Sequence, residues 1–253
     1  MSSVNHETKG QGFILRITAA QEADVIVKIL SSNGEKISAF AKAGLKSRKR
    51  FGGSLQPLFN ITYRLTKKSP QQDLYFLEEA HVRHDFKNLR TQLERLTSAS
   101  YAAELVELCA HEGLENTELY NLFGATLRAL DSGLSVEGVL RQFEVKLLSI
   151  LGWLPGLQKC ASCGVEEKEL TLNPDQGLVV CRDCGRFPLI LTREVAQHIL
   201  NLLGTSVLEN DLDESQAQRI GQITMALLQS HWGHQKPKAL QFMASMRRFQ
   251  KNP

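Results

Sequence analysis

Hydrophobic and polar positions alternate along several short segments in the first eighty residues, which is the period-two pattern of a half-buried strand. The pattern is clearest in segment 58–65, where one face carries Phe59, Ile61, Tyr63 and Leu65 and the other carries Asn60, Thr62 and Arg64. Segments 12–17, 24–30, 36–41 and 73–80 predict four more strands. The apolar face of segment 58–65 is expected to lie in the core, with Phe59 and Tyr63 as alternative stacking residues.

A turn signal fixes the pairing of two of these strands. Asn33-Gly34 separates segments 24–30 and 36–41, and this dipeptide is typical of a tight hairpin, so the two strands are expected to be antiparallel neighbours. Five short strands fit a small closed or nearly closed barrel. The five-stranded barrel that binds nucleic acid is the OB-fold, although other small β barrels fit the same pattern.

From about residue 84 the hydrophobic period changes from two to 3.6, which predicts helices. Three stripes follow this period: Phe86, Leu89, Leu93 and Leu96; Leu119, Leu122, Phe123, Thr126, Leu127 and Leu130; Val136, Val139, Leu140, Phe143, Leu147 and Leu151. Asn116 and Ser135 are placed as N-caps, Gly133 as a helix stop and Pro155-Gly156 as the end of the third helix. Further helices are expected from Thr192, from Glu214 and in a basic last segment from Lys238.

The predicted fold class is α+β. We expect an N-terminal OB-fold barrel over residues 1–80 and a helical domain over 81–253, with a cysteine module at about 157–188 inserted in it.

That module contains two CxxC pairs, "CASCG" at 160–164 and "CRDCG" at 181–185, separated by seventeen residues. Two such pairs supply four thiolates, which suit tetrahedral Zn²⁺ bound by Cys160, Cys163, Cys181 and Cys184. The alternatives are a redox pair and an iron–sulfur site. A redox CxxC usually occurs once and near a βαβ pattern, which is not found here, so zinc is favoured.

Four thiolates fill the coordination sphere and leave no position for an activated water, so we expect one structural zinc. This argues against a metallohydrolase or a zinc deaminase. No HExxH, Walker-type or GxSxG pattern occurs either, and the fifth cysteine, Cys109, is expected to be a small core residue. The sequence therefore predicts that the protein is not an enzyme.

Charge is distributed unevenly in a chain whose net charge is only +3. Nine of its 30 Lys and Arg lie between Glu35 and Asp73, where there is no acid, while the other 21 face 27 Asp and Glu. A positive region on an otherwise acidic molecule suggests a polyanion-binding face, although such a run can also be a solvated loop.

The positive region predicts a site that binds nucleic acid without sequence preference, which needs cations along a phosphate track and a ring for stacking. Phe51 is the stacking candidate because it follows three contiguous cations. The cations assigned to the track are Lys42, Lys46, Arg48, Lys49 and Arg50, extended by Arg64, Lys67 and Lys68.

No apolar run approaches the roughly 20 residues that a membrane span needs, and the start "MSSVNHETKG" lacks the features of a secretory signal. With cysteines arranged for metal binding, a soluble cytoplasmic protein without a membrane partner is expected.

Two stretches together, "AKAGLKSRKRFGGSLQP" and "RQFEVKLLSILGWLPGLQKCASCG", resemble the bacterial RecO family of recombination mediators. The resemblance covers most of the chain. It implies an OB-fold, a helical domain and a zinc module in a non-enzymatic, nucleoid-associated DNA repair protein. It further implies binding of single- and double-stranded DNA, annealing of complementary strands, and action with RecR on SSB-coated DNA, where RecA is helped to load.

A competing hypothesis from another class is a zinc-ribbon adaptor that binds proteins through the metal module and its acidic helices. Under that hypothesis the basic run is incidental. Charge reversal at the basic run discriminates the two, because only the mediator depends on it for DNA binding.

Overall fold

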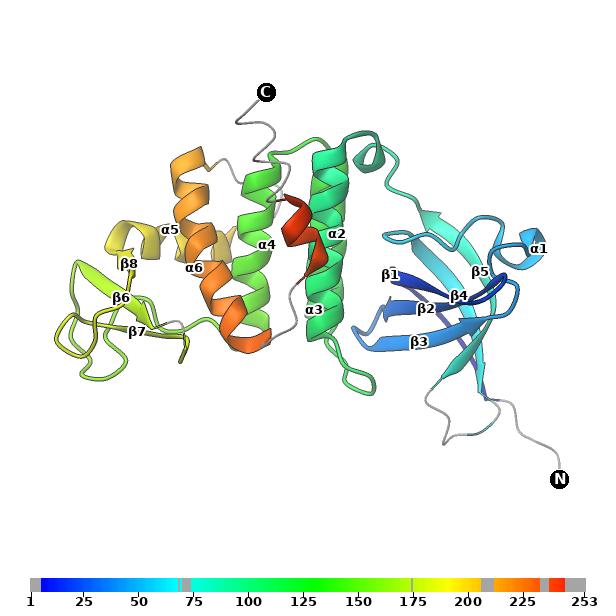
Figure 1. Ribbon diagram of the computed structural model, residues 1–253, viewed down its shortest axis with the longest axis horizontal. Helices are drawn as coiled ribbons and strands as arrows, with labels where there is room; N and C mark the ends of the chain where they lie inside the picture. The colour runs from blue at the N-terminus through cyan, green and yellow to red at the C-terminus, as the bar shows by residue number, and fades with distance from the viewer. Residues whose placement is uncertain are drawn as a thin grey trace. The chain divides into compact units, whose positions relative to one another are not determined.

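The structure, a computed structural model, describes residues 6–67, 69, 74–173, 175–205, 212–232 and 237–243. It divides into two compact units, residues 1–131 and 132–253, and each is described by itself. The predicted α+β fold, a barrel followed by helices, is confirmed (Figure 1). The first unit extends beyond residue 80 and includes two helices, and the domain division at 80/81 stays a prediction.

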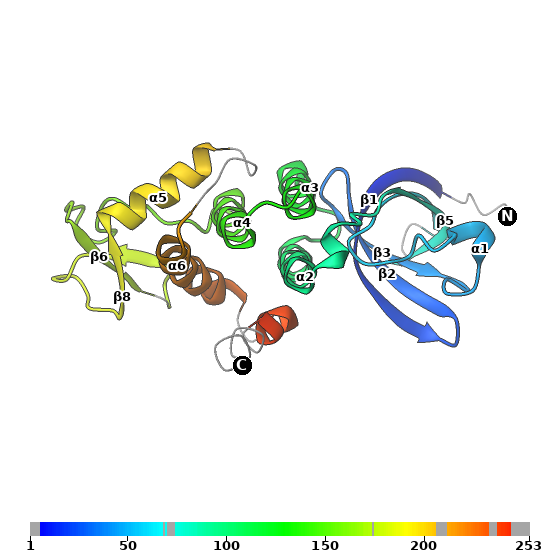
Figure 2. The ribbon, with the colours of Figure 1, turned by 90° about the horizontal axis from the view of Figure 1, so that it is seen from above.

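Five strands form a closed barrel, which Figure 2 shows from above. Their order around the barrel is β1-β2-β3-β5-β4. They are β1 (His6–Gln21), β2 (Asp24–Ser31), β3 (Lys36–Ala41), β4 (Asn60–Lys67) and β5 (Tyr75–His84). The predicted β2–β3 hairpin at Asn33-Gly34 is confirmed, with Gly34 at a φ of +85°. A parallel pairing between β3 and β5 closes the barrel.

Strand β1 is much longer than the predicted segment 12–17, because it belongs to two pairings. Its first half pairs with β4 and its second half with β2. Both pairings include Gly12, where a Cβ would collide with the Leu30 carbonyl oxygen. A glycine at this position therefore lets two backbones approach closely.

The predicted inward face of β4 is confirmed, because Phe59, Ile61, Tyr63 and Leu65 all belong to the buried core of the barrel. The same core contains side chains from the other strands and from the β3–β4 connection. Phe59 and Tyr63 thus pack inside the barrel, as the alternation favoured, and do not form a stacking surface.

Helices α2 (Leu93–Cys109) and α3 (Thr117–Asp131) complete the first unit after a short 3₁₀ turn, η1 (Leu89–Thr91). The predicted N-cap of α3 is confirmed by a 3.0 Å hydrogen bond from the Leu119 N–H to Asn116 Oδ1. Helix α3 packs against the barrel through Phe13 of β1, whose ring lies 5.2 Å from that of Phe123 in an edge-on arrangement.

The second unit contains α4 (Val136–Ile150), α5 (Arg193–Gly204) and α6 (Glu214–Trp232), with α4 packed against both others. The predicted N-cap of α4, Ser135, is confirmed, and the helix predicted from Thr192 is α5, which Thr192 caps. The predicted stop at Pro155-Gly156 is wrong, since α4 ends at Ile150 and the chain turns at Gly152, at a φ of +70°.

A small sheet in the second unit was not predicted. Strands β6 (Glu169–Asn173), β7 (Leu178–Val180) and β8 (Leu189–Thr192) pair antiparallel in the order β7-β6-β8. Of the basic last segment, residues 238–243 are helical and the remainder lies outside the described residues. Among the helices described, none is long and apolar enough to cross a membrane.

Candidate metal centre and nucleic-acid interface

The four predicted cysteine ligands come together in the second unit. Their sulfur atoms all lie within 4.8 Å of one another, and the Sγ atoms of Cys163 and Cys181 are 3.7 Å apart. In each pair the first cysteine is buried and the second is exposed, so the cluster lies at the surface with one side covered. Four thiols at this mutual distance form a donor set that fits one tetrahedral ion.

Each CxxC pair is a tight backbone turn. In the first, the Gly164 N–H donates to the Cys160 carbonyl at 2.9 Å, and Gly164 has a φ of +76°, which only glycine adopts readily. In the second, the Cys184 and Gly185 N–H groups donate to the Cys181 carbonyl at 3.2 and 3.0 Å. Both sulfurs of a pair therefore point to the same side of their turn.

The unpredicted β6–β7 hairpin brings the two turns together. The first pair precedes β6, the second follows β7, and the Ala161 N–H donates to the Val179 carbonyl at 2.8 Å. At the open end of the hairpin, Arg182 of the second turn forms a 2.7 Å ion pair with Glu169 at the start of β6. Seventeen intervening residues are thus the length of chain needed for one hairpin.

The surroundings of Cys160 favour its thiolate. Backbone hydrogen bonds from Cys181 and Cys163 lower the pKa of the Cys160 thiol from 9.0 to about 6. The neighbouring thiols act in the opposite direction on Cys184 and raise its pKa. Ionisation of one thiol in the cluster therefore opposes ionisation of the next. A bound cation offsets this repulsion between thiolates, so the cluster is typical of a metal site.

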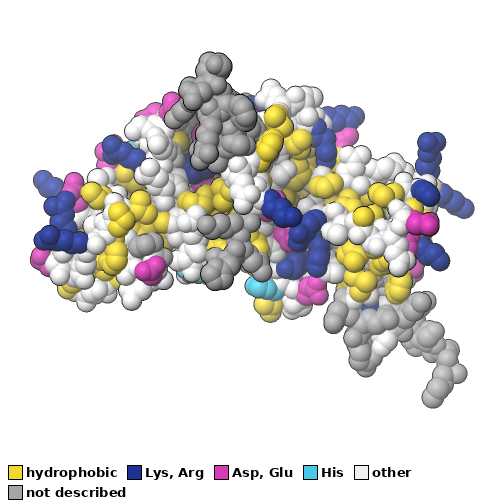
Figure 3. All heavy atoms as spheres, in the orientation of Figure 1, with side chains coloured by type: hydrophobic (Ala, Val, Ile, Leu, Met, Phe, Trp, Pro, Cys, Tyr) yellow, Lys and Arg dark blue, Asp and Glu magenta, His cyan; other side chains and the backbone are white. Residues whose placement is uncertain are grey.

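The second candidate site is the basic segment, defined here as residues 42–50. It follows β3 and runs into α1 (Arg48–Phe51), a single helical turn. Four of its cations are exposed and form no ion pair with any described carboxylate: Lys42, Lys46, Arg48 and Lys49. Figure 3 shows the Lys and Arg side chains that project from the barrel around α1, at the right of the view.

Arg50 differs from the other cations of the basic segment. Its side chain donates to the Lys42 carbonyl and, at 3.2 Å, to Ser47 Oγ, so it ties the ends of the segment together. Its guanidinium also lies 4.8 Å from the centre of the Phe51 ring. These contacts give Arg50 a part in shaping the segment.

The predicted stacking role of Phe51 is wrong. Its side chain is only 3% exposed and belongs to the barrel core. One helical turn directs the preceding cations outward and this ring inward, and the Ser54 hydroxyl fixes the following loop by donating to the Ala80 carbonyl at 2.9 Å. A ring that fills the barrel cannot present a face to a base.

Two of the three cations predicted to extend the track, Arg64 and Lys67, have contacts within the barrel. Arg64 lies between two carboxylates: its Nε is 2.9 Å from Glu79 Oε1 and its Nη1 is 3.6 Å from Glu7 Oε2. The hydrogen bond to Glu79 raises the pKa of Arg64. Lys67 lies 4.1 Å above the ring of Tyr75. Lys68 lies outside the described residues.

A pocket that sequence analysis missed lies beside Arg83 of β5 and Arg128 of α3. The two arginines come from different elements far apart in the chain, so no local pattern signals them.

Fold and site together define a class: proteins that join an OB-like barrel to a helical part carrying a four-cysteine cluster. Comparison with known families gives the particular one. The model for the recombination protein O N terminal matches residues 1–86 and that for the recombination protein O C terminal matches residues 90–241. The chain belongs to the recombination protein O family.

Curated relatives agree with this assignment. The DNA repair protein RecO of Pelobacter propionicus is 33% identical over 241 residues, which cover 94% of this chain and 96% of the relative. That of a Roseiflexus species is 33% identical over 246 residues, covering 94% and 85%. That of an Anaeromyxobacter species is 35% identical over 176 residues, covering 69% of each.

Proposed function

We propose that this protein is a non-enzymatic recombination mediator of DNA repair. It binds single- and double-stranded DNA, anneals complementary strands, and acts with RecR on SSB-coated DNA, where it helps RecA to load. Membership of the recombination protein O family and the name DNA repair protein RecO carried by the relatives support this proposal.

The observation that carries it is the set of four exposed cations in the basic segment that pair with no described carboxylate. Two of them, Arg48 and Lys49, lie on α1, which Phe51 anchors to the barrel. Lysine and arginine side chains in such an arrangement displace counterions from phosphates without reading bases. Two DNA strands whose phosphates are neutralised on one protein surface repel each other less, which favours their pairing. The mechanism is therefore electrostatic and requires no acid, base or nucleophile.

The cysteine cluster holds one structural Zn²⁺ in this proposal. When bound, the ion supplies four strong bonds that lock the two CxxC turns to each other. The chain's own contribution is to present four sulfurs at one point and to cover one side of them. With four protein ligands there is no place for a reacting water, so the ion stabilises the module.

Fluorescence anisotropy of a labelled single-stranded oligonucleotide at several salt concentrations tests the DNA-binding part. The variant is Arg48→Glu with Lys49→Glu, which spares Arg50 and its structural contacts. The matched control is Arg186→Glu with Arg219→Glu, two exposed cations of the second unit. We expect the first variant to bind at least tenfold more weakly and the control to bind like the wild type.

Salt dependence sharpens this test. If the four exposed cations each displace one counterion, the log–log slope of affinity against salt is about −3 on single strands, and it becomes shallower in the Arg48/Lys49 variant. Unchanged affinity and slope in that variant would overturn the assignment of the basic segment. If DNA binding is absent altogether while protein partners still bind, the adaptor hypothesis holds instead.

Annealing and RecA loading need their own assays. We expect the wild type to speed pairing of complementary SSB-coated oligonucleotides, and RecR to stimulate RecA filament formation on the same substrate. The Arg48/Lys49 variant should lose both in proportion to its affinity. An annealing rate that stays at the wild-type value in this variant contradicts the electrostatic mechanism.

A further inference from the structure

A polar pocket of about 270 Å³ lies in the first unit, between the barrel and α3. This volume is just below the range for small-ligand pockets, about 300–1,000 Å³. Its floor includes the ring of Phe13, which packs against Gly124 of α3. A Cβ on Gly124 would lie 3.0 Å from that ring and 3.3 Å from Arg128 Nη1, so the glycine leaves the room that both side chains occupy.

Two arginines line this pocket, Arg83 near the end of β5 and Arg128 on α3. Both are exposed, and neither forms an ion pair with any carboxylate in the described part of the chain. No acidic residue is among those that line the pocket. Guanidinium groups bind oxyanions through paired, planar hydrogen bonds. Their geometry matches that of phosphate and of carboxylate.

Aromatic rings line the same pocket. The ring of His84 lies 4.2 Å from that of the buried Phe86, and the ring of Tyr120 lies 5.0 Å from that of the buried Phe13. Each outer ring is thus supported from behind by a core ring. His84 Nδ1 accepts a 3.2 Å hydrogen bond from the Phe86 N–H, which leaves the proton of the neutral imidazole on Nε2 as a donor.

Two side-chain amides complete the lining. Asn60 is only 7% exposed, and its Nδ2 donates to the Tyr120 hydroxyl at 3.3 Å. Asn121 lies beside Tyr120 on α3 and is exposed. Amides both donate and accept hydrogen bonds, which is the chemistry of a base edge. Cations for phosphate, rings for stacking and amides for base edges are the three elements of single-strand recognition.

We propose that this pocket binds one nucleotide of single-stranded DNA. Its phosphate pairs with Arg83 and Arg128, and its base lies against His84 and Tyr120 within reach of the amides. The inference rests on the proposed function only in taking single-stranded DNA as the ligand, because the pocket shares no residue with the basic segment. An acidic peptide offers carboxylates to the arginines but no planar face to the rings, which is why a nucleotide is favoured.

Photo-crosslinking tests the pocket directly. The probe is an oligodeoxythymidylate with one 4-thiothymidine, irradiated with the full chain and followed by mapping of the crosslinked peptides. We expect crosslinks in the segments around His84 and Tyr120. In Arg83→Ser with Arg128→Ser the yield of these crosslinks should fall at least tenfold, because the nucleotide loses its phosphate contacts and with them its stacked position. The control Arg186→Ser with Arg219→Ser should keep them.

The basic-segment variant separates this proposal from the proposed function. Crosslinks at His84 and Tyr120 that persist at saturating concentrations of the Arg48→Glu, Lys49→Glu protein support the pocket, whatever that variant does to overall affinity. Crosslinks confined to the basic segment, with wild-type affinity in the Arg83/Arg128 variant, overturn the pocket and leave the proposed function standing. An absence of any DNA binding by the wild type overturns both.

Gly124→Ala provides a second variant without a change of charge. The added methyl group displaces Phe13 or Arg128, so crosslinking at the pocket should fall while the salt slope of the remaining binding stays as in the wild type. Thermal unfolding identifies any loss that comes from misfolding. Unchanged crosslinking in a folded Gly124→Ala protein would count against the pocket.

Discussion

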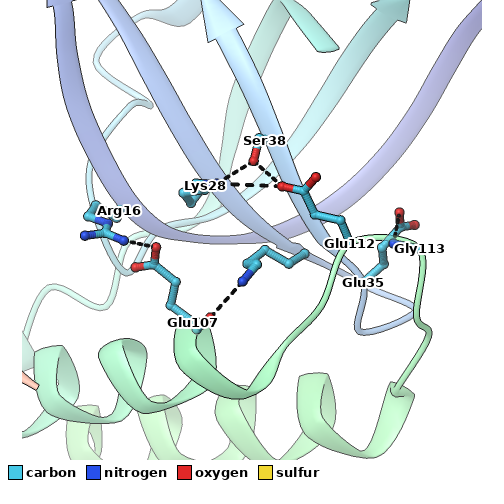
Figure 4. A network of polar contacts seen from close by, with 8 residues as sticks. Arg16, Lys28, Glu35, Ser38, Glu107, Glu112 and Gly113 are labelled. Atoms are coloured by element: carbon cyan, nitrogen blue, oxygen red, sulfur yellow. Dashed lines mark hydrogen bonds and ion pairs between the residues drawn. The ribbon is translucent and has the colours of Figure 1, made fainter. Parts of the chain in front are cut away.

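Lys36 of β3 donates a 3.0 Å hydrogen bond from its Nζ to the backbone carbonyl of Glu107, near the end of α2. The Glu107 carboxylate pairs in turn with Arg16 of β1, and Glu112 lies 3.7 Å from Lys28 of β2 (Figure 4). Acids within and after α2 therefore neutralise cations on two strands of the barrel, β1 and β2. The basic segment, which has no such partners among the described residues, is left as the more strongly positive surface.

Removing these acids is expected to strengthen DNA binding. In Glu107→Gln with Glu112→Gln, Arg16 and Lys28 lose their carboxylates and become available to phosphates. The log–log salt slope on single strands should steepen by about 0.7 for each freed cation that contacts DNA. The cost in unfolding free energy should stay at about 1 kcal/mol or less for each pair, because both are partly exposed. Anisotropy and thermal unfolding measure the two effects.

A matched control removes the same charge elsewhere. Glu22→Gln with Glu167→Gln alters an exposed and a half-buried glutamate, and no ion pair is found for either among the described residues. If this control strengthens binding as much as the Glu107/Glu112 variant does, net charge alone accounts for the effect and the local neutralisation is not the cause.

Phe51 distinguishes a core residue from a stacking residue. Its removal in Phe51→Ala should cost about 3–5 kcal/mol of unfolding free energy, the range for truncating a buried aromatic ring. Phe51→Leu keeps most of the apolar volume, so it should fold and bind single-stranded DNA with wild-type affinity. A folded Phe51→Leu protein with DNA binding reduced tenfold or more would mean that the ring contacts bases after all.

The Phe51 prediction failed for a reason that is physical and local. Three contiguous cations followed by an aromatic ring look like one binding loop along the chain, but a single helical turn separates them onto opposite sides. The strands of the barrel were predictable because one face of each is buried, which imposes the period of two. Strands β6 to β8 were not, since each is too short to show a period.

The cysteine cluster was predictable because each CxxC is a local turn and only one hairpin joins the two. Arg83 and Arg128 were not, because their proximity depends on how α3 packs against the barrel. Likewise, the neutralisation of Arg64 by Glu7 and Glu79 depends on strand register, which places Arg64 opposite Glu79. Local chemistry is therefore visible in the sequence, whereas contacts across elements require the fold.

Metal analysis tests the cysteine cluster. We expect one zinc per chain in protein purified without chelator, and its loss in Cys160→Ser with Cys181→Ser. Because binding of a structural metal is coupled to folding, this variant and the chelated wild type should both unfold at a lower temperature. Cys109→Ser, at a cysteine outside the cluster, should keep the metal. Wild-type protein without bound metal would refute the site.

Cys109 makes stability depend on pH at alkaline values. Burial raises the pKa of its thiol from 9.0 to about 12. Above pH 9 the unfolded chain therefore loses a proton that the folded chain keeps, so the unfolding free energy falls as pH rises from 9 to 12. Cys109→Ala removes this contribution and should decline less steeply over that range in denaturant titrations. Parallel curves for the two proteins would contradict the assignment.

Gly221 of α6 allows a buried ion pair to form in the second unit. Arg141 of α4 is 7% exposed, and its Nη2 lies 3.1 Å from Glu144 Oε1, on a side chain with no exposure. Thr224 of α6 donates a 2.5 Å hydrogen bond to the other carboxylate oxygen. A Cβ on Gly221 would collide with Arg141 Nη1, so only glycine leaves space for the guanidinium against α6.

Gly221→Ala is therefore expected to destabilise the protein although alanine is the better helix former. The intrinsic gain in an α-helix is about 1 kcal/mol, whereas displacing Arg141 from a fully buried carboxylate costs about 3–5 kcal/mol, and the second effect wins. Denaturant unfolding measures the difference. Gly204→Ala is the control, because no atom lies within 4 Å of its added methyl group at the end of α5. Equal stability of the two variants would show that Arg141 can move aside without losing Glu144.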